Sequence, residues 1–183
     1  SGRDPDTEKP LSSTAGIPDT IHILHHLKGH LGAWKPATEP LYENGAPRWR
    51  EHPKGRLVDV VALPLENLPA DVELYPLDLS LGNVDIQPQP AMPVAIIGFP
   101  FGLAAGGAWP IWKTGHIATD PGVDYQADRP AFLIDATTRS GMSGAPVVIR
   151  VSGGYNDSKG NYVISPGIRT KFLGVYSGRI HGE

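Results

Sequence analysis

Chain-breaking residues limit what this sequence can fold into. Glycine occurs 22 times and proline 19 times in 183 residues, and both are spread along the chain between short apolar runs. Such dispersed breakers fit many strands and turns, whereas no long stretch repeats apolar residues at the spacing of a helix. Because 40% of the residues are apolar, the chain also has enough material for a folded core. The sequence therefore predicts an all-β protein.

Short apolar runs mark the expected strands. In the first half they are residues 20–27 and 57–65, and the second run is expected to be buried although it contains an acidic residue. Residues 66–91 contain several prolines and little pattern, which predicts a connection between two domains, 1–80 and 81–183. Two packed barrels and a β-sandwich both fit this order. The strands expected in the second half are 93–99, 109–119, 131–135, 145–151, 161–165 and 172–177.

Charge and residue types exclude several classes of partner. The net charge is −3 and the basic residues form no stripe, so neither a nucleic acid nor a membrane is an expected partner. The chain has no cysteine, which excludes disulfides, thiolate metal sites and a cysteine nucleophile. No apolar run reaches the length of about 18 residues that a membrane-spanning helix requires. His116 and His181 have no partner at metal-ligand spacing, so no metal or other cofactor is expected.

The segment RSGMSGAPV, residues 139–147, carries the strongest chemical signal. Gly141 and Gly144 flank the pair Met142-Ser143. A nucleophilic serine needs a tight turn that projects its Oγ outward, with adjacent N–H groups directed at one point to hold an oxyanion. Glycines on both sides permit such a turn without a side-chain clash. Taken alone, the same four residues also fit a plain turn between two strands.

A single acidic residue, Asp59, stands inside the apolar run LVDVVALPL. An unpaired carboxylate among apolar neighbours is unfavourable, so a buried Asp59 is expected to accept hydrogen bonds from an imidazole and from backbone amides. These are the surroundings of the acid in a catalytic triad. The other interpretation places Asp59 on the exposed face of an edge strand.

Three motifs resemble the trypsin-like serine peptidases, in particular the cysteine-free bacterial type related to the HtrA proteases. They are VAIIGFPFGL followed by WKTGHIAT, then IDATTRSGMSGAPV, then LGVYSGR, and they occur in the order of that family. The dipeptide His52-Pro53 before Asp59 matches a further turn of the family. Over residues 20–179 the resemblance implies a double β-barrel with an incomplete first barrel. Residues 1–80 would carry the triad aspartate and residues 81–183 the nucleophile.

The resemblance also implies an activity and a set of roles. The chain would be a serine endopeptidase domain that cleaves polypeptides through an acyl-enzyme, with Ser143 as nucleophile and Asp59 as triad acid. The backbone N–H groups of Gly141 and Ser143 would form the oxyanion hole, where one donor is typically worth about 2.7 to 4 kcal/mol. An extended substrate would pair with the chain after Leu173 as an added strand. The residues that would bind substrate are Thr137, Ser177, Gly178 and Arg179.

A triad also needs a histidine that accepts the serine proton. The family places it about 45 residues before the acid, near Thr14 here, where the chain has no histidine. The resemblance therefore implies that the chain begins after the catalytic histidine and also ends early, so that it is inactive as given. The alternatives are a remnant that has lost catalysis, or a base supplied unusually by His25 or His26. The histidines that lie between Thr14 and Asp59 are His22, His25, His26, His30 and His52.

Three further classes of protein compete with a peptidase. The first is a catalytically dead binding module on a protease scaffold. The second is an α/β-hydrolase, whose Gly-x-Ser-x-Gly elbow fails here because the fifth position is Ala145. The third is a carbohydrate-binding β-sandwich, which would explain the Trp and Tyr residues but not the ordered segments around Asp59, Asp135 and Ser143.

Overall fold

Strands dominate the structure, a computed structural model that describes residues 8–10 and 12–179. The helical elements among these residues are three short 3-10 turns, η1 (Gly55–Leu57), η2 (Leu79–Asn83) and η3 (Pro100–Gly102). The predicted all-β class is confirmed, and no alternation of strands and helices supports an α/β-hydrolase. All strand pairs of the described residues are antiparallel, and none of their sheets closes into a barrel. No described helix has the length and apolar character needed to cross a bilayer.

Contacts divide the chain into two compact units. Unit 1 consists of Ser1–Glu51 and Val61–Tyr75, and unit 2 consists of His52–Val60 and Pro76–Glu183. The change of unit after Tyr75 lies close to the domain boundary expected at residue 80. The short segment before β6, which includes Asp59, belongs to unit 2 by its contacts, although the sequence places it in the first domain.

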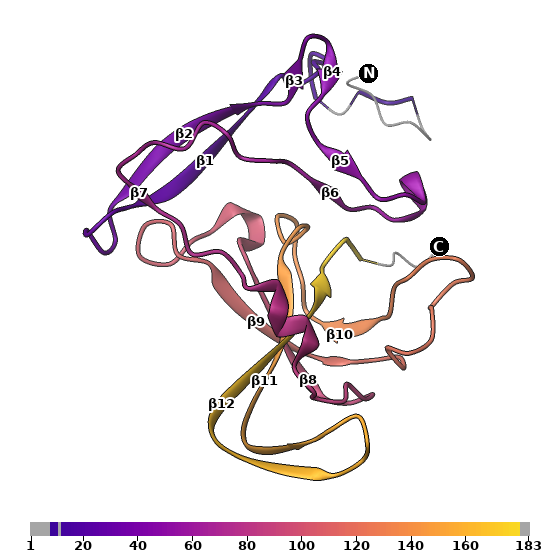
Figure 1. The fold of residues 1–183 in the computed structure, drawn as a ribbon. Coiled ribbons are helices and arrows are strands. Elements are labelled where there is room, and N and C mark those ends of the chain that lie inside the picture. The colour runs from indigo at the N-terminus through magenta and orange to yellow at the C-terminus, as the bar shows by residue number, and fades with distance from the viewer. Residues whose placement is uncertain (1–7, 11, 180–183) are drawn as a thin grey trace. The chain divides into compact units, whose positions relative to one another are not determined.

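Unit 1 is built on a three-stranded antiparallel sheet in the order β2-β1-β7 (Figure 1). Its strands are β1 (Thr20–Leu27), β2 (Trp34–Pro40) and β7 (Val72–Glu73). The long pair runs in register from Thr20 opposite Pro40 to His26 opposite Trp34. The strand predicted at residues 20–27 is confirmed, whereas β2 and β7 were not expected from the sequence.

Two small hairpin ladders complete unit 1. They pair β3 (Tyr42–Glu43) with β4 (Ala46–Pro47), and β5 (Arg50–Glu51) with β6 (Val61–Ala62). The predicted buried strand at residues 57–65 is wrong. Only β6 is a strand there, and Leu57 and Val61 are 58% and 61% exposed. The run starts inside η1, and Pro64 has no N–H to extend the short ladder, so strand pairing is confined to two residues.

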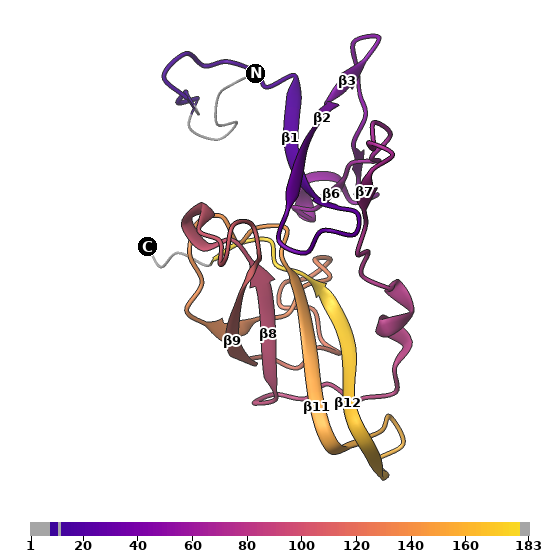
Figure 2. The same ribbon diagram turned by 90° about the vertical axis from the view of Figure 1, so that its left-hand side faces the viewer.

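Unit 2 contains a five-stranded antiparallel sheet in the order β10-β9-β8-β11-β12, and Figure 2 shows four of its strands side by side. In this unit the strands predicted at residues 93–99, 109–119 and 145–151 are confirmed, whereas the one predicted at 131–135 starts only at Ile134. The last two predicted strands form one long strand, because a bulge between Ser152 and Gly153 lets the hairpin continue past Pro166 and Gly167. The strands are β8 (Pro93–Gly98), β9 (Ile111–Ile117), β10 (Ile134–Ala136), β11 (Pro146–Asn156) and β12 (Tyr162–Val175).

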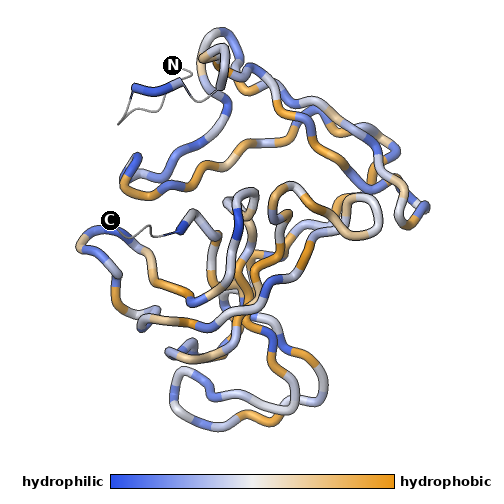
Figure 3. Tube along the Cα trace, turned by 180° about the vertical axis from the view of Figure 1, so that it is seen from behind, coloured by the Kyte–Doolittle hydropathy of each residue, from blue (hydrophilic) through white to orange (hydrophobic). Residues whose placement is uncertain are grey.

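The main hydrophobic core lies under this sheet of unit 2. Apolar residues follow its central strands in Figure 3. One face of β8 and β11 supplies half of the buried core residues, in keeping with the alternation of side chains along a strand. The buried members are Ile86, Val94, Ile96, Ile117, Met142, Ala145, Val147 and Ile149. Two of them, Met142 and Ala145, come from the loop that also carries the predicted nucleophile, so the core fixes that loop from below.

Candidate active site

The loop between β10 and β11 carries Ser143. The preceding residue, Met142, is 0% exposed and lies in the core, whereas Ser143 is exposed. Neighbouring side chains in this turn therefore face opposite directions, with an apolar anchor below and a hydroxyl above. An anchored turn that presents a hydroxyl is what a nucleophilic serine requires.

Both glycines of the motif adopt a backbone conformation that favours glycine. Gly141 has φ 89° and Gly144 has φ 87°. A Cβ atom on Gly141 would lie 2.5 Å from the carbonyl oxygen of Phe99, closer than real contacts allow. A Cβ atom on Gly144 would meet nothing within 4 Å. The glycine at 141 is therefore required by space as well as by conformation, as the tight turn predicted from the sequence implies.

Hydrogen bonds occupy some of the backbone N–H groups of this loop and leave others unbonded. Met142 N–H donates to the Arg139 carbonyl at 3.2 Å, and Gly144 N–H donates to the Tyr176 carbonyl at 2.8 Å. The N–H groups of Gly141 and Ser143 have no acceptor among the described residues. These two groups are the pair that the resemblance to trypsin-like peptidases assigns to an oxyanion hole. Both residues are exposed, so their N–H groups are accessible to a ligand oxygen.

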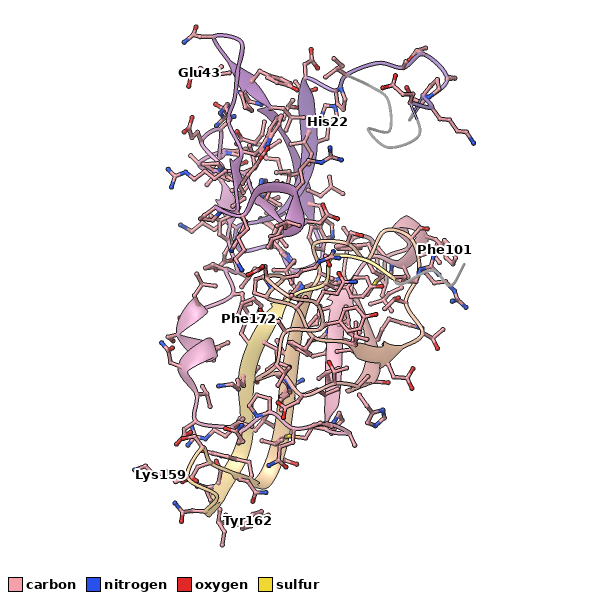
Figure 4. All side chains as sticks on the ribbon, turned by 90° about the vertical axis from the view of Figure 1, so that its right-hand side faces the viewer. His22, Glu43, Phe101, Lys159, Tyr162 and Phe172 are labelled. Atoms are coloured by element: carbon pink, nitrogen blue, oxygen red, sulfur yellow. The ribbon has the colours of Figure 1, made fainter. Side chains whose placement is uncertain are left out.

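The loop after β8 packs against the nucleophile loop. Phe101 N–H donates to the Ser140 carbonyl at 2.6 Å, and Phe101 itself has φ 56°. A Cβ atom on Gly98 would lie 3.2 Å from the Met142 sulfur, so the end of β8 also approaches the buried anchor closely. Figure 4 labels Phe101 at this end of unit 2, with Lys159 and Tyr162 at the opposite end of the β11–β12 hairpin. Two separate motifs of the sequence thus meet at the loop that carries Ser143.

A pair of hydroxyl groups lies beside the same loop. Thr138 is 3% exposed, and its Oγ1 lies 2.7 Å from the hydroxyl oxygen of Tyr176. Thr137, which the resemblance to trypsin-like peptidases nominates for substrate specificity, is exposed instead. No sequence pattern indicated the pair of Thr138 and Tyr176, because the two residues are 38 positions apart. Only the fold brings them together.

Asp59 does not have the predicted surroundings. It is exposed, lies in an irregular segment after η1, and makes no hydrogen bond or ion pair with another described residue. The expected burial of its carboxylate is wrong, because the apolar run around it forms no buried strand. Its role as the triad acid stays a prediction.

The predicted substrate-binding segment continues from the end of β12. Ser177 is half-buried, and Gly178 and Arg179 are exposed. Their backbone groups make no hydrogen bond with other described residues. Free N–H and C=O groups in such a segment are available to pair with an extended peptide.

No described histidine of unit 2 is hydrogen-bonded to Ser143 as a catalytic base would be. The described histidines of this unit are His52 and His116, and neither forms a hydrogen bond with Ser143. In unit 1, His25 is 7% exposed and its Nε2 has no hydrogen-bond partner among the described residues. His181 lies outside the described residues.

A buried ion pair in unit 1 was not found from the sequence. Glu39 is 0% exposed and receives hydrogen bonds from Arg48 Nη1 at 3.1 Å and from Asn67 N–H at 2.7 Å. Burial by itself raises the pKa of the Glu39 carboxyl, but these hydrogen bonds outweigh burial and hold the pKa below its ordinary value. The pair is saturated with partners, so it stabilises unit 1 and offers no catalytic group.

Comparisons of the chain with protein-family models, with curated proteins and with solved structures found no match. Residues 8–10 and 12–179 contain no group of three or more side chains placed to hold a metal ion. What is left to indicate a function is the geometry of the loop around Ser143.

Proposed function

We propose that the protein is a trypsin-like serine endopeptidase domain of the double-barrel type, with Ser143 as its nucleophile. One observation carries this proposal. An exposed serine follows a fully buried Met142, and the loop leaves the N–H groups of Gly141 and Ser143 without an acceptor among the described residues. A hydroxyl next to two free amide donors is the arrangement that acyl transfer to a serine needs.

The proposed reaction proceeds through an acyl-enzyme. Ser143 Oγ attacks the carbonyl carbon of a peptide bond while an imidazole accepts the hydroxyl proton. The N–H groups of Gly141 and Ser143 donate to the oxyanion that forms. The C–N bond then breaks, the imidazole returns the proton to the leaving amine, and water hydrolyses the acyl-enzyme by the same steps in reverse. The polypeptide substrate pairs as an added strand with Ser177, Gly178 and Arg179.

A catalytic triad also contains an imidazole and an acid besides the serine. None of the chain's histidines stands in the turn that the family uses for its base, so we propose that the base comes from outside these 183 residues. Asp59 is the proposed partner of that imidazole. It lies in the unit that also contains Ser143, and its carboxylate makes no hydrogen bond with another described residue, so it is free to accept one.

Labelling with a fluorophosphonate probe tests the proposal. The full-length natural protein should be labelled on Ser143, located by peptide mass spectrometry, and should hydrolyse an unstructured polypeptide such as casein. Ser143→Ala should abolish both, and Ser140→Ala, which removes a hydroxyl from the same loop, should abolish neither. A full-length protein without label and without hydrolysis, or hydrolysis that survives Ser143→Ala, contradicts the proposal.

A peptide-binding module without catalysis is the second candidate. It is favoured by the absence of a hydrogen bond between Ser143 and either described histidine of unit 2. The free backbone of Ser177, Gly178 and Arg179 serves such a module equally well. Saturable binding of extended peptides by a full-length protein that never cleaves them supports this candidate over the peptidase.

A further inference from the structure

Tyr176 is bonded to both ends of the loop that carries the nucleophile. We propose that Tyr176 is a positioning residue, which closes the loop from Thr138 to Ala145 and so fixes the direction of the N–H groups of Gly141 and Ser143. The inference rests on the proposed peptidase function, and it adds a residue that the sequence did not indicate.

The side chain of Tyr176 holds the first end of the loop. Its hydroxyl lies 2.7 Å from Thr138 Oγ1. Thr138 is 3% exposed, and its N–H donates to the Ala136 carbonyl at 2.9 Å, which ties the residue to the end of β10. A hydroxyl buried this deeply needs a hydrogen-bond partner, and Tyr176 is the one that the fold supplies.

The backbone of Tyr176 holds the second end. Its carbonyl accepts the N–H of Gly144 at 2.8 Å, and its own N–H donates to the Ala145 carbonyl at 2.8 Å. This exchange continues the ladder of β11 and β12 by one more step, up to the residue after Ser143. The ring of Tyr176 packs against the hydrophobic core, so the clamp itself is held in place.

Between the two ends, the loop after β8 supports the nucleophile loop through the hydrogen bond from the Phe101 N–H to the Ser140 carbonyl. Met142 anchors the middle of the nucleophile loop, and the two predicted oxyanion donors on either side of Met142 are unbonded among the described residues. Donors that are not held by bonds of their own depend on the rest of the loop for their direction. Release of the Thr138 end therefore lets both donors move, and small displacements of this kind reduce reaction rates strongly.

Tyr176 also precedes the segment Ser177, Gly178 and Arg179, where the substrate is proposed to pair. One residue thus joins the strand that would bind a peptide to the loop that would attack it. Because the free backbone of that segment is unchanged when the tyrosine hydroxyl is removed, binding and turnover should respond differently. A loss of kcat with little change in KM distinguishes positioning of the reacting groups from a general loss of structure.

The test compares four single variants of the full-length protein and one double variant, Tyr176→Phe with Thr138→Val. Tyr176→Phe removes only the hydroxyl, Thr138→Val removes its partner at nearly constant volume, and Thr138→Ser keeps the partner. Tyr155→Phe is the matched control, because Tyr155 also packs against the core of unit 2 but its hydroxyl makes no hydrogen bond with other described residues. The measurements are kcat and KM for one peptide substrate, and hydrogen exchange of the Met142 and Gly144 amides.

Tyr176→Phe and Thr138→Val should each lower kcat by about tenfold to a hundredfold with KM within about twofold. The double variant should be no worse than either single one, since both remove the same bond. Thr138→Ser and Tyr155→Phe should keep the original kcat. Exchange of the Met142 amide, which donates to the Arg139 carbonyl next to the released end, should become faster in the two damaging variants and stay unchanged in the two others. The Gly144 amide keeps its bond to the Tyr176 carbonyl in all of them and serves as the internal control.

Two results overturn the inference. One is an unchanged kcat in Tyr176→Phe, and the other is an unchanged rate of Met142 exchange in the same variant. The exchange measurement needs no catalysis, so it tests the clamp even where the unaltered protein neither hydrolyses peptides nor takes up the probe. An unaltered protein that neither hydrolyses peptides nor takes up the probe contradicts the proposed peptidase function but not the inference about Tyr176.

Discussion

Phe99 and Gly141 approach each other so closely that no side chain fits between them. A Cβ atom on Gly141 would lie 2.5 Å from the Phe99 carbonyl oxygen and 3.2 Å from the amide nitrogen of Gly102. The loop after β8 therefore fills the space behind the nucleophile loop and leaves only a glycine at this position. This contact explains why the two glycine-containing motifs occur together in the sequence.

Gly141→Ala should destabilise the protein more than Gly144→Ala. Both residues have φ near 90°, where an L-residue loses roughly 1 to 2 kcal/mol, so both substitutions reduce the free energy of unfolding. Only the methyl group at 141 also collides with Phe99, whereas the one at 144 meets open space. Urea denaturation of the two variants measures the difference. Equal losses would show that the clash with Phe99 is relieved at no cost.

Met142 should tolerate an apolar residue of similar size and nothing smaller. It is 0% exposed and packs in the core of unit 2. Met142→Ala leaves a cavity there and should lower the free energy of unfolding by about 2 to 5 kcal/mol, whereas Met142→Leu should lower it by less than about 1.5 kcal/mol. Thermal unfolding followed by circular dichroism provides the measurement. A mild effect of Met142→Ala would mean that the nucleophile turn is held by its hydrogen bonds alone.

Sequence patterns found the strands that are bounded by breakers and rich in apolar residues. Residues 20–27 and 93–98 form strands where predicted, because each run ends at turn-forming residues. The strand β2 was missed because it contains Pro36 and Pro40, which normally exclude a strand. It lies at the edge of its sheet, where a proline does not remove a ladder hydrogen bond that another strand needs.

The candidate site was predicted in part. The tight turn around Ser143 could be predicted because the two glycines that permit it are adjacent to Met142 and Ser143 in the sequence. Tyr176 and Thr138, in contrast, meet only through the pairing of β11 with β12, and Glu39 meets Asn67 across 28 residues. The burial predicted for Asp59 failed because an apolar run does not by itself show whether a pairing strand exists.

Acid should destabilise the protein through Glu39. The pKa of its carboxyl is lowered in the folded state, mainly because its hydrogen bonds to the Asn67 amide and to Arg48 outweigh burial. A group with a lowered pKa contributes stability above the pKa of the unfolded chain, about 4.3 for a glutamate, and loses it as the pH falls through the folded value. Chemical denaturation between pH 7 and pH 3 should therefore show stability falling below about pH 4.3.

Glu39→Gln provides the control for this pH dependence. It removes the charge but keeps the shape, leaving Arg48 with the exposed carboxylate of Glu66, 2.9 Å from Arg48 Nη2, as its remaining counterion. The variant should therefore lower the free energy of unfolding at pH 7 by less than the loss of about 3 to 5 kcal/mol expected for a buried ion that loses its counterion entirely. Because the amide does not titrate, the variant should lose less stability than the original protein on going to pH 3. An identical acid response in both proteins would assign the loss of stability to other carboxylates.

Asp59→Asn separates a catalytic role from a structural one. Asp59 is exposed and makes no hydrogen bond with another described residue, so the substitution should change the free energy of unfolding by less than about 0.5 kcal/mol. If Asp59 orients the imidazole, the same substitution in the full-length protein should lower kcat by about 10⁴-fold, because an amide favours the wrong tautomer of the histidine. The control is Asp135→Asn, which alters another exposed aspartate, located on β10, and should leave kcat unchanged. Equal activity of the Asp59→Asn variant and the unaltered protein would remove Asp59 from the proposed triad while leaving Ser143 in place.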